Sequence, residues 1–246
     1  MSRVLRWDAL TRDEIRELAP AALTVVPVGS TEQHGPHLAT GTDATLVTRI
    51  AERAAAAASR PDTVLLAPTL AFGASDHHLA FGGTLSLRVE TFQRVLLDVL
   101  ASTARAGCGR VFILNGHGGN TAACAIAIEE ASREHGLLAA AAIYSQLLEP
   151  GSTDAPVPGH AGRFETSLML ALAGDDVRMD DARPSPGGAA RVRHRGLSVS
   201  EPGRWANLDG FTDRPDTASA ALGAELLEAC TRAVAEAFEE VADLDA

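Results

Sequence analysis

The chain has 246 residues, of which 46% are hydrophobic, and a formal net charge of −11. This length and composition predict a single globular domain over residues 1–246, and the acidity argues against binding nucleic acid, which needs a basic surface. The 21 residues counted as Lys and Arg are all arginine, so the absence of lysine excludes Schiff-base chemistry and attachment of pyridoxal phosphate.

Apolar runs with strand character alternate with segments of helical periodicity. In chain order, the expected elements are a strand at 22–28, a helix at 45–58, a strand at 63–67, a helix at 89–105, a strand at 110–114, a helix at 122–134, a strand at 137–143, a helix at 164–172 and a helix at 217–241. Residues 184–215 are rich in Gly, Pro and Arg and are expected to form an extended excursion. The alternation predicts an α/β fold with a mostly parallel central sheet and helices on both faces.

Neither targeting segments nor cysteine motifs are evident. The N-terminus lacks the apolar segment of a secretory signal, and no apolar run approaches the length of a membrane span. The cysteines, Cys108, Cys124 and Cys230, lack the spacing of a disulfide framework or a zinc knuckle, so we expect buried free thiols. These features indicate a cytoplasmic protein that does not bind membranes.

Three polar clusters come after predicted strands. The first strand is followed by GSTEQHG, the third strand by NGHGGN, and the loop after the fourth strand contains GHAGRFE. In parallel α/β sheets, ligand sites form outside the carboxyl ends of the strands. We therefore expect the three clusters to meet at one edge of the sheet.

The first cluster and the helix after it offer three metal-ligand candidates. Glu32 and His34 lie two residues apart on an extended segment, so a carboxylate and an imidazole can face one ion. The alternative is a polar loop with a hydrogen-bonded histidine. Asp43 comes directly before a predicted helix, where a carboxylate either caps the helix or bridges two cations.

The later clusters add another imidazole and another carboxylate. Glycines flank His117, which lets the backbone turn sharply beside a ligand, although a tight turn with an incidental histidine would look the same. Glu165 lies in the first turn of a predicted helix, where the helix dipole also favours it. His160 lies in a loop and is available as a proton carrier near neutral pH. Two imidazoles and three carboxylates suit two Zn²⁺ or Mn²⁺ ions.

The phrases VGSTEQHGPHLATGTD, GASDHHLAFGGTLSL, NGHGGN and HAGRFETS resemble the creatininase family in order and spacing, over about residues 5–180. The resemblance implies an α/β fold with a parallel sheet, a dinuclear metal centre and a homohexamer. It also implies metal ligation by Glu32, His34, Asp43 and His117, with Asp43 bridging the two ions, and a catalytic role for His160. The substrate-binding residues that we expect are Ser75, His78, Gly118 and Gly119.

Two departures from the family pattern bear on the substrate. Creatinine-hydrolysing members carry a metal-binding glutamate two residues after the histidine of the NGH motif, where this chain has Gly119. This chain resembles the members with the NGHGGN form, and this resemblance implies that Glu165 binds metal in place of the missing glutamate. Creatinine-specific members also carry a tryptophan shortly before the catalytic histidine, where this chain has DAPVP at residues 154–158.

The leading hypothesis is a two-metal amidohydrolase that cleaves the C–N bond of a small cyclic or linear amide. Hydroxide held between the ions would attack the amide carbon, and His160 would relay the proton to the leaving nitrogen. Zn²⁺ and Mn²⁺ are the expected ions, with Fe²⁺ as a third candidate. The alternatives are a peptidase of the mycofactocin-precursor type or a formamide deformylase with the same centre, and a metal-binding assembly protein without activity.

Overall fold

The computed structural model describes residues 4–60, 63–149, 159–187 and 199–244. Within these residues the chain forms a five-stranded sheet in the order β1-β3-β2-β4-β5, in which every neighbouring pair is parallel. The strands are β1 (Leu5–Arg6), β2 (Leu23–Val28), β3 (Val64–Leu66), β4 (Arg110–Asn115) and β5 (Leu138–Ile143). The helices are α1 (Arg12–Leu18), α2 (Thr42–Ala57), α3 (Val89–Arg105), α4 (Thr121–His135), α5 (Arg163–Ala173), α6 (Arg204–Asn207) and α7 (Ala220–Asp243).

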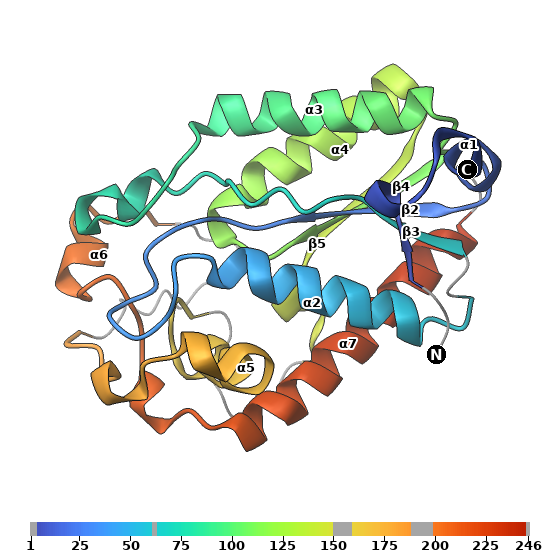
Figure 1. Cartoon of the computed structure of the whole chain (residues 1–246). Coiled ribbons are helices and arrows are strands. Elements are labelled where there is room, and N and C mark those ends of the chain that lie inside the picture. Colours follow the sequence, from blue (N-terminus) through green and yellow to red (C-terminus); the bar gives the residue numbers. More distant parts are fainter. Residues whose placement is uncertain (1–3, 61–62, 150–158, 188–198, 245–246) are drawn as a thin grey trace.

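Helices cover both faces of the sheet (Figure 1). Alternate residues of β4 point to opposite faces: Phe112 and Leu114 pack with the core under α2, α5 and α7, whereas Val111 and Ile113 pack with the core under α3 and α4. The ring of Phe112 meets Phe238 of α7 edge to face, with centroids 5.3 Å apart, which adds about 0.5–1.5 kcal/mol to the burial of both rings. The predicted α/β fold is therefore confirmed.

All four predicted strands are present, and the helix predicted at 89–105 has those bounds as α3. Two helix starts are corrected. α7 begins at Ala220 with Ser219 as its N-cap, three residues later than predicted. α2 begins at Thr42 with Gly41 as its N-cap, so Asp43 lies inside the first turn and does not precede the helix. The short β1 and α1 were not predicted, and the excursion at 184–215 contains α6.

Glycines bring the first turn of α2 against the ends of β2 and β4. A Cβ built at Gly29 would lie 2.7 Å from the main chain of Ala44, and one built at Gly116 would lie 3.0 Å from the carbonyl oxygen of Asp43. Real Cβ atoms essentially never approach another atom closer than 3.0 Å, so neither position has room for a side chain. The absence of a side chain at both positions thus lets Asp43 stand directly over the strand ends.

Two further expectations can be compared with the structure. Cys108, Cys124 and Cys230 are buried free thiols, as the sequence predicts. Among the helices in the described part of the chain, none combines the length and the apolarity that crossing a membrane requires.

Candidate metal centre

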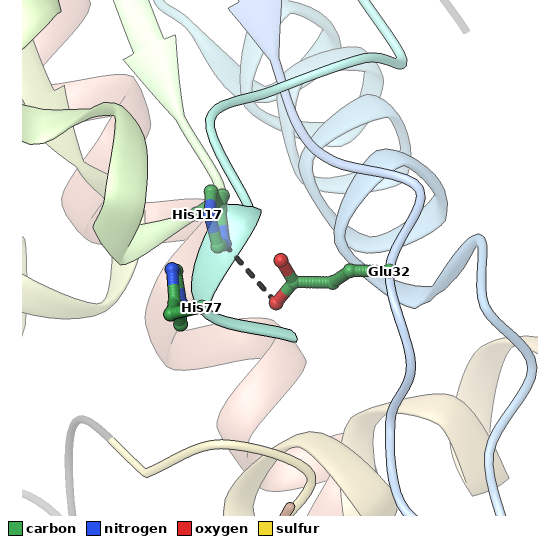
Figure 2. Close-up of side chains that lie close together, drawn as sticks. All are labelled: Glu32, His77 and His117. Atoms are coloured by element: carbon green, nitrogen blue, oxygen red, sulfur yellow. Dashed lines mark ion pairs between the residues drawn. The ribbon is translucent and has the colours of Figure 1, made fainter. Parts of the chain in front are cut away.

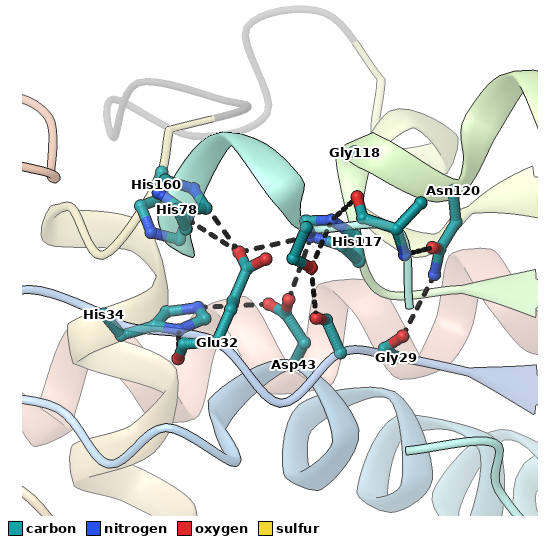
Figure 3. Close-up of polar contacts among 12 residues, drawn as sticks. Gly29, Glu32, His34, Asp43, His78, His117, Gly118, Asn120 and His160 are labelled. Carbon is teal, nitrogen blue, oxygen red and sulfur yellow. Dashed lines mark hydrogen bonds and ion pairs between the residues drawn. The ribbon is translucent and has the colours of Figure 1, made fainter. Parts of the chain in front are cut away.

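Asp43 lies between two imidazoles at the carboxyl ends of β2 and β4 (Figure 3). Its Oδ1 is 3.1 Å from His34 Nε2, and its Oδ2 is 3.1 Å from His117 Nδ1. Glu165, in the first turn of α5, approaches the same His34 Nε2 at 3.9 Å. One carboxylate thus joins two groups of potential ligands, which is the arrangement that a pair of cations requires.

Glu32 forms the centre of the second group. Its Oε1 lies 3.3 Å from His117 Nδ1, 3.4 Å from His160 Nδ1 and 3.6 Å from His78 Nε2. Glu32 is fully buried, yet neither of its carboxylate oxygens has a hydrogen-bond partner among the described residues, and the same holds for Asp43 Oδ2. Buried carboxylate oxygens without donors are costly unless a cation binds them.

The described residues contain three sets of potential metal ligands, and within each set the ligand atoms all lie within 4.8 Å of one another. They are Glu32 with His77 and His117, shown in Figure 2; Glu32 with His34 and His160; and His34 with Asp43 and Glu165. Oxygen and imidazole donors of this kind suit Zn²⁺ and Mn²⁺, so the residues present fit the expected ions. The sequence did not indicate His77 as a metal ligand, since the HH pair at 77–78 has no ligand spacing.

Backbone carbonyl oxygens fix the ring orientation of three histidines. His34 Nδ1 donates to the carbonyl oxygen of Glu32 at 3.0 Å, His117 Nε2 to that of Ala74 at 3.1 Å, and His160 Nε2 to that of Gln33 at 2.9 Å. A carbonyl oxygen only accepts, so in the neutral, metal-binding form of each ring the other nitrogen keeps its lone pair and faces the carboxylates. Such bonds from the second nitrogen are typical of metal-binding histidines.

In His78, the ring nitrogen that faces the carboxylates is the one that carries the hydrogen. The Gln33 side-chain oxygen accepts from Gly35 N, so its Nε2 is the donor, and that nitrogen lies 2.8 Å from His78 Nδ1. His78 Nδ1 therefore accepts, and its Nε2 carries the hydrogen that points toward Glu32. His78 is accordingly a hydrogen-bond donor to the site, which fits its expected contact with the substrate better than metal ligation.

The pKa values reflect negative charge gathered away from water. The pKa of Glu165 is raised from 4.5 to about 7, chiefly by burial and in addition by the neighbouring Asp43 carboxylate, against the opposing effect of His34. Burial lowers the pKa of His34, but Asp43 and then Glu165 outweigh it and raise this pKa to about 10. The histidine thus retains a proton because the carboxylates demand positive charge, a demand that divalent cations would also meet.

A cavity of about 740 Å³ opens onto the cluster. Asp43, His117, His160 and Glu165 line it, together with the expected substrate-binding residues His78, Gly118 and Gly119. Ser75 is not among the described residues that line the cavity: it is fully buried, with its Oγ 2.5 Å from Ser30 Oγ and 3.2 Å from His117 Nε2. Its hydroxyl supports His117 from behind.

Gly119 occupies a position where no side chain fits. A Cβ built there would collide with the carbonyl oxygen of Ala74 and with His117 Nε2, whereas one built at Gly118 would meet nothing within 4 Å. A glutamate at position 119 is therefore incompatible with this placement of His117. Glu165 lies beside His34, with its Oε2 3.9 Å from His34 Nε2, and places a third carboxylate at the cluster.

Sequence reasoning missed one wall of the cavity. Trp205 of α6 packs against His78, His160 and His77, with ring centroids 4.6, 5.3 and 5.7 Å apart. Arg204 and Glu201 line the cavity beside it. These residues lie in the excursion at 184–215, which has no periodicity to reveal its contacts. The stretch at 154–158, where creatinine-specific members carry a tryptophan, lies outside the described residues.

Comparisons with known proteins agree with this geometry. The family model Creatininase (creatinine amidohydrolase) matches residues 8–238. Over 230 residues the chain is 35% identical to the mycofactocin precursor peptide peptidase of Mycobacterium tuberculosis strain H37Rv, covering 86% of this chain and 84% of that protein. It is 29% identical to the creatinine amidohydrolase of Pseudomonas putida over 248 residues, covering 92% of each.

Solved structures extend the likeness to the whole fold. A mutant creatininase of the Zn–Zn type and a creatininase described as the Mn form each superpose with a TM-score of 0.81 and 28% identity, covering 97% of this chain and 98% of theirs. The family match over nearly the whole chain, the shared fold and the cluster of carboxylates and imidazoles lead to one conclusion. The chain belongs to the creatininase family of hydrolases.

Proposed function

We propose that the chain is a dinuclear metal-dependent amidohydrolase that cleaves an amide C–N bond. The observation that carries this proposal is the placement of Asp43, whose two oxygens face His34 and His117 separately at 3.1 Å. His34, Asp43 and Glu165 would hold one ion, and Glu32, Asp43 and His117 the other, with Zn²⁺ and Mn²⁺ favoured over Fe²⁺ by the names of the solved relatives. Bound there, the two cations would lower the pKa of water and polarise the amide carbonyl.

The surrounding residues would bind the substrate and move its protons. His160 Nδ1 keeps its lone pair toward the cluster because its Nε2 donates to Gln33, so this ring can accept a proton and deliver it to the leaving nitrogen. His78 Nε2–H points into the same space and can donate to a substrate oxygen. Trp205 packs against both rings and would exclude bulk water from them.

Two observations favour a peptide as the second candidate substrate. The cavity of about 740 Å³ is larger than a small cyclic amide needs and lies in the range of about 300–1,000 Å³ that drug-sized ligands occupy. In addition, the relative that is 35% identical bears the name of a precursor-peptide peptidase. A short peptide or an acylated amino acid would fill this volume, and the chemistry at the cluster would be the same.

We also propose that the chain assembles into a homohexamer. Support comes from large apolar side chains exposed on one segment, 72–89: Phe72, Leu79, Leu85 and Val89 are each 47–58% exposed. Apolar side chains grouped in this way commonly mark protein interfaces. Light scattering after size-exclusion chromatography measures the state directly, and a monomeric mass would contradict the proposal.

A substrate panel on metal-defined protein tests the proposed function. The panel contains a cyclic amide, an N-formyl amine, an N-acyl amino acid and a short peptide, and the released amine is quantified. We expect hydrolysis of at least one compound by the protein loaded with Mn²⁺ or Zn²⁺, and none by the chelated protein. A protein that retains two ions per chain and hydrolyses nothing would contradict the proposal and favour a metal-binding assembly protein.

A further inference from the structure

Arg204, the first residue of α6, lines the cavity and gives it a positive charge. Among the described residues that line the cavity, it is the only one with a permanent positive charge, since the others are apolar, neutral, acidic or histidine. Asp43 and Glu165 of the candidate metal centre line the same cavity with their carboxylates, and Glu201 adds a third acidic side chain. One cavity therefore holds both the candidate metal centre and a guanidinium.

This guanidinium has no acceptor in the described part of the chain. Arg204 Nε is buried without a hydrogen-bond partner, and no ion pair joins Arg204 to Glu201, although both line the cavity. Other arginines of the same region have carboxylate partners, as Arg214 has Asp216 at 2.7 Å. A buried N–H donor without an acceptor is uncommon in a folded protein, and a ligand in the cavity could supply the missing acceptor to Arg204 Nε.

Trp205 connects the guanidinium to the reacting groups. Arg204 Cζ lies 5.5 Å from the centroid of the Trp205 ring, and that ring also contacts His78 at 4.6 Å, His160 at 5.3 Å and His77 at 5.7 Å. One indole ring thus separates Arg204 from the histidines that face Glu32. A substrate whose amide lies at the cluster would reach Arg204 with a group several bonds away.

We propose that Arg204 binds a free carboxylate of the substrate, so that the preferred substrates are N-acyl amino acids or short peptides. This inference rests on the proposed amidohydrolase function and names the substrate class of the same site. A guanidinium presents parallel N–H donors that match both oxygens of a carboxylate. Trp205 holds the guanidinium by a cation–π contact and offers its ring to the apolar part of the substrate.

A matched substrate pair measures the contribution of the carboxylate. N-formyl-phenylalanine and N-formyl-phenylalaninol contain the same formamide bond, and only the first carries a carboxylate. We expect the metal-loaded wild type to prefer the acid by roughly tenfold to a hundredfold in kcat/KM, mainly through KM, because a charge-assisted hydrogen bond has that effect. Arg204→Met should abolish this preference, Arg204→Lys should retain part of it, and Arg94→Met, on the exposed side of α3, should keep it in full.

The outcomes separate failure of this inference from failure of the proposed function. Equal kcat/KM for the two compounds in the wild type, with both hydrolysed, would overturn the carboxylate site and leave the amidohydrolase intact. If neither compound is hydrolysed, isothermal titration calorimetry measures the binding of N-formyl-phenylalanine to the same metal-loaded proteins and tests the carboxylate site without turnover. Binding that Arg204→Met weakens at least tenfold supports the site, and binding of equal strength, or none to the wild type, overturns it.

Discussion

His160 Nε2 lies 2.9 Å from the main-chain carbonyl oxygen of Gln33. Because that oxygen can only accept, the neutral ring carries its hydrogen on Nε2 and directs an unprotonated Nδ1 toward Glu32 Oε1 at 3.4 Å. An unprotonated nitrogen in this place suits a proton acceptor, and it suits a metal ligand equally well. Truncating the side chain would remove a bound ion if His160 is a ligand, but only the proton transfer if it is an acid–base group.

Replacing His160 with alanine separates these roles. We expect His160→Ala to keep both ions and to lower kcat by roughly 10²- to 10⁴-fold, the usual contribution of a positioned acid–base group, with a much smaller change in KM. Metal content, melting temperature and kcat are measured on one preparation. His135→Ala, at the exposed end of α4, is the control and should match the wild type. Loss of metal would make His160 a ligand, and a near-normal kcat in a metal-replete variant would remove it from the mechanism.

The bridging role proposed for Asp43 predicts a coupled loss of metal. Asp43→Ala should lower occupancy of both ions, because its two oxygens face different imidazoles. Elemental analysis gives the ions bound per chain, and Asp98→Ala, on the exposed face of α3, should bind as many ions as the wild type. Two ions still bound to the Asp43 variant would reduce Asp43 to a residue that stabilises the first turn of α2.

Adjacent glycines in the NGHGGN motif should respond differently to one added methyl group. Gly119→Ala would push a Cβ into Ala74 and His117, so we expect a loss of about 1–3 kcal/mol in the free energy of unfolding, together with weaker metal binding. Gly118→Ala meets open space and should change the unfolding free energy little. Urea denaturation of both variants measures the difference, and equal stability of the two would be inconsistent with the close contact at Gly119.

Stability at acidic pH should depend on His37. Burial lowers the pKa of this histidine from 6.5 to about 4, and its Nε2 lies 2.9 Å from Thr166 Oγ1. Between these two values the unfolded chain binds a proton that the folded chain does not, so stability present above pH 6.5 is lost as the pH falls toward 4. His37→Gln should be less stable at pH 7 but should lose less on acidification, whereas His135→Gln should follow the wild-type curve. Parallel curves for wild type and His37→Gln would contradict the assignment.

The features that depend on local sequence pattern, namely the strands and the polar clusters after them, were predicted from the sequence. The strands around the site have continuous apolar runs, and the parallel register of Val28 with Asn115 brings the clusters that follow β2 and β4 to one level. The start of α2 was misplaced because its N-cap, Gly41, has no side chain to signal a cap. Trp205 could not be assigned because α6 has only four residues and meets the histidines through contacts between distant segments. The collision at Gly119 also depends on a distant partner, Ala74.

In the proposed mechanism, hydrolysis requires two ions held around Asp43. The most direct measurement titrates chelated protein with Mn²⁺, or in parallel with Zn²⁺, and follows bound metal per chain and turnover of the best panel substrate in the same samples. Both ions suit the ligand set, so we expect no turnover without metal and a rise that reaches its plateau at two bound ions per chain. Full turnover in the chelated protein, or a plateau at one ion per chain, would contradict the two-metal account.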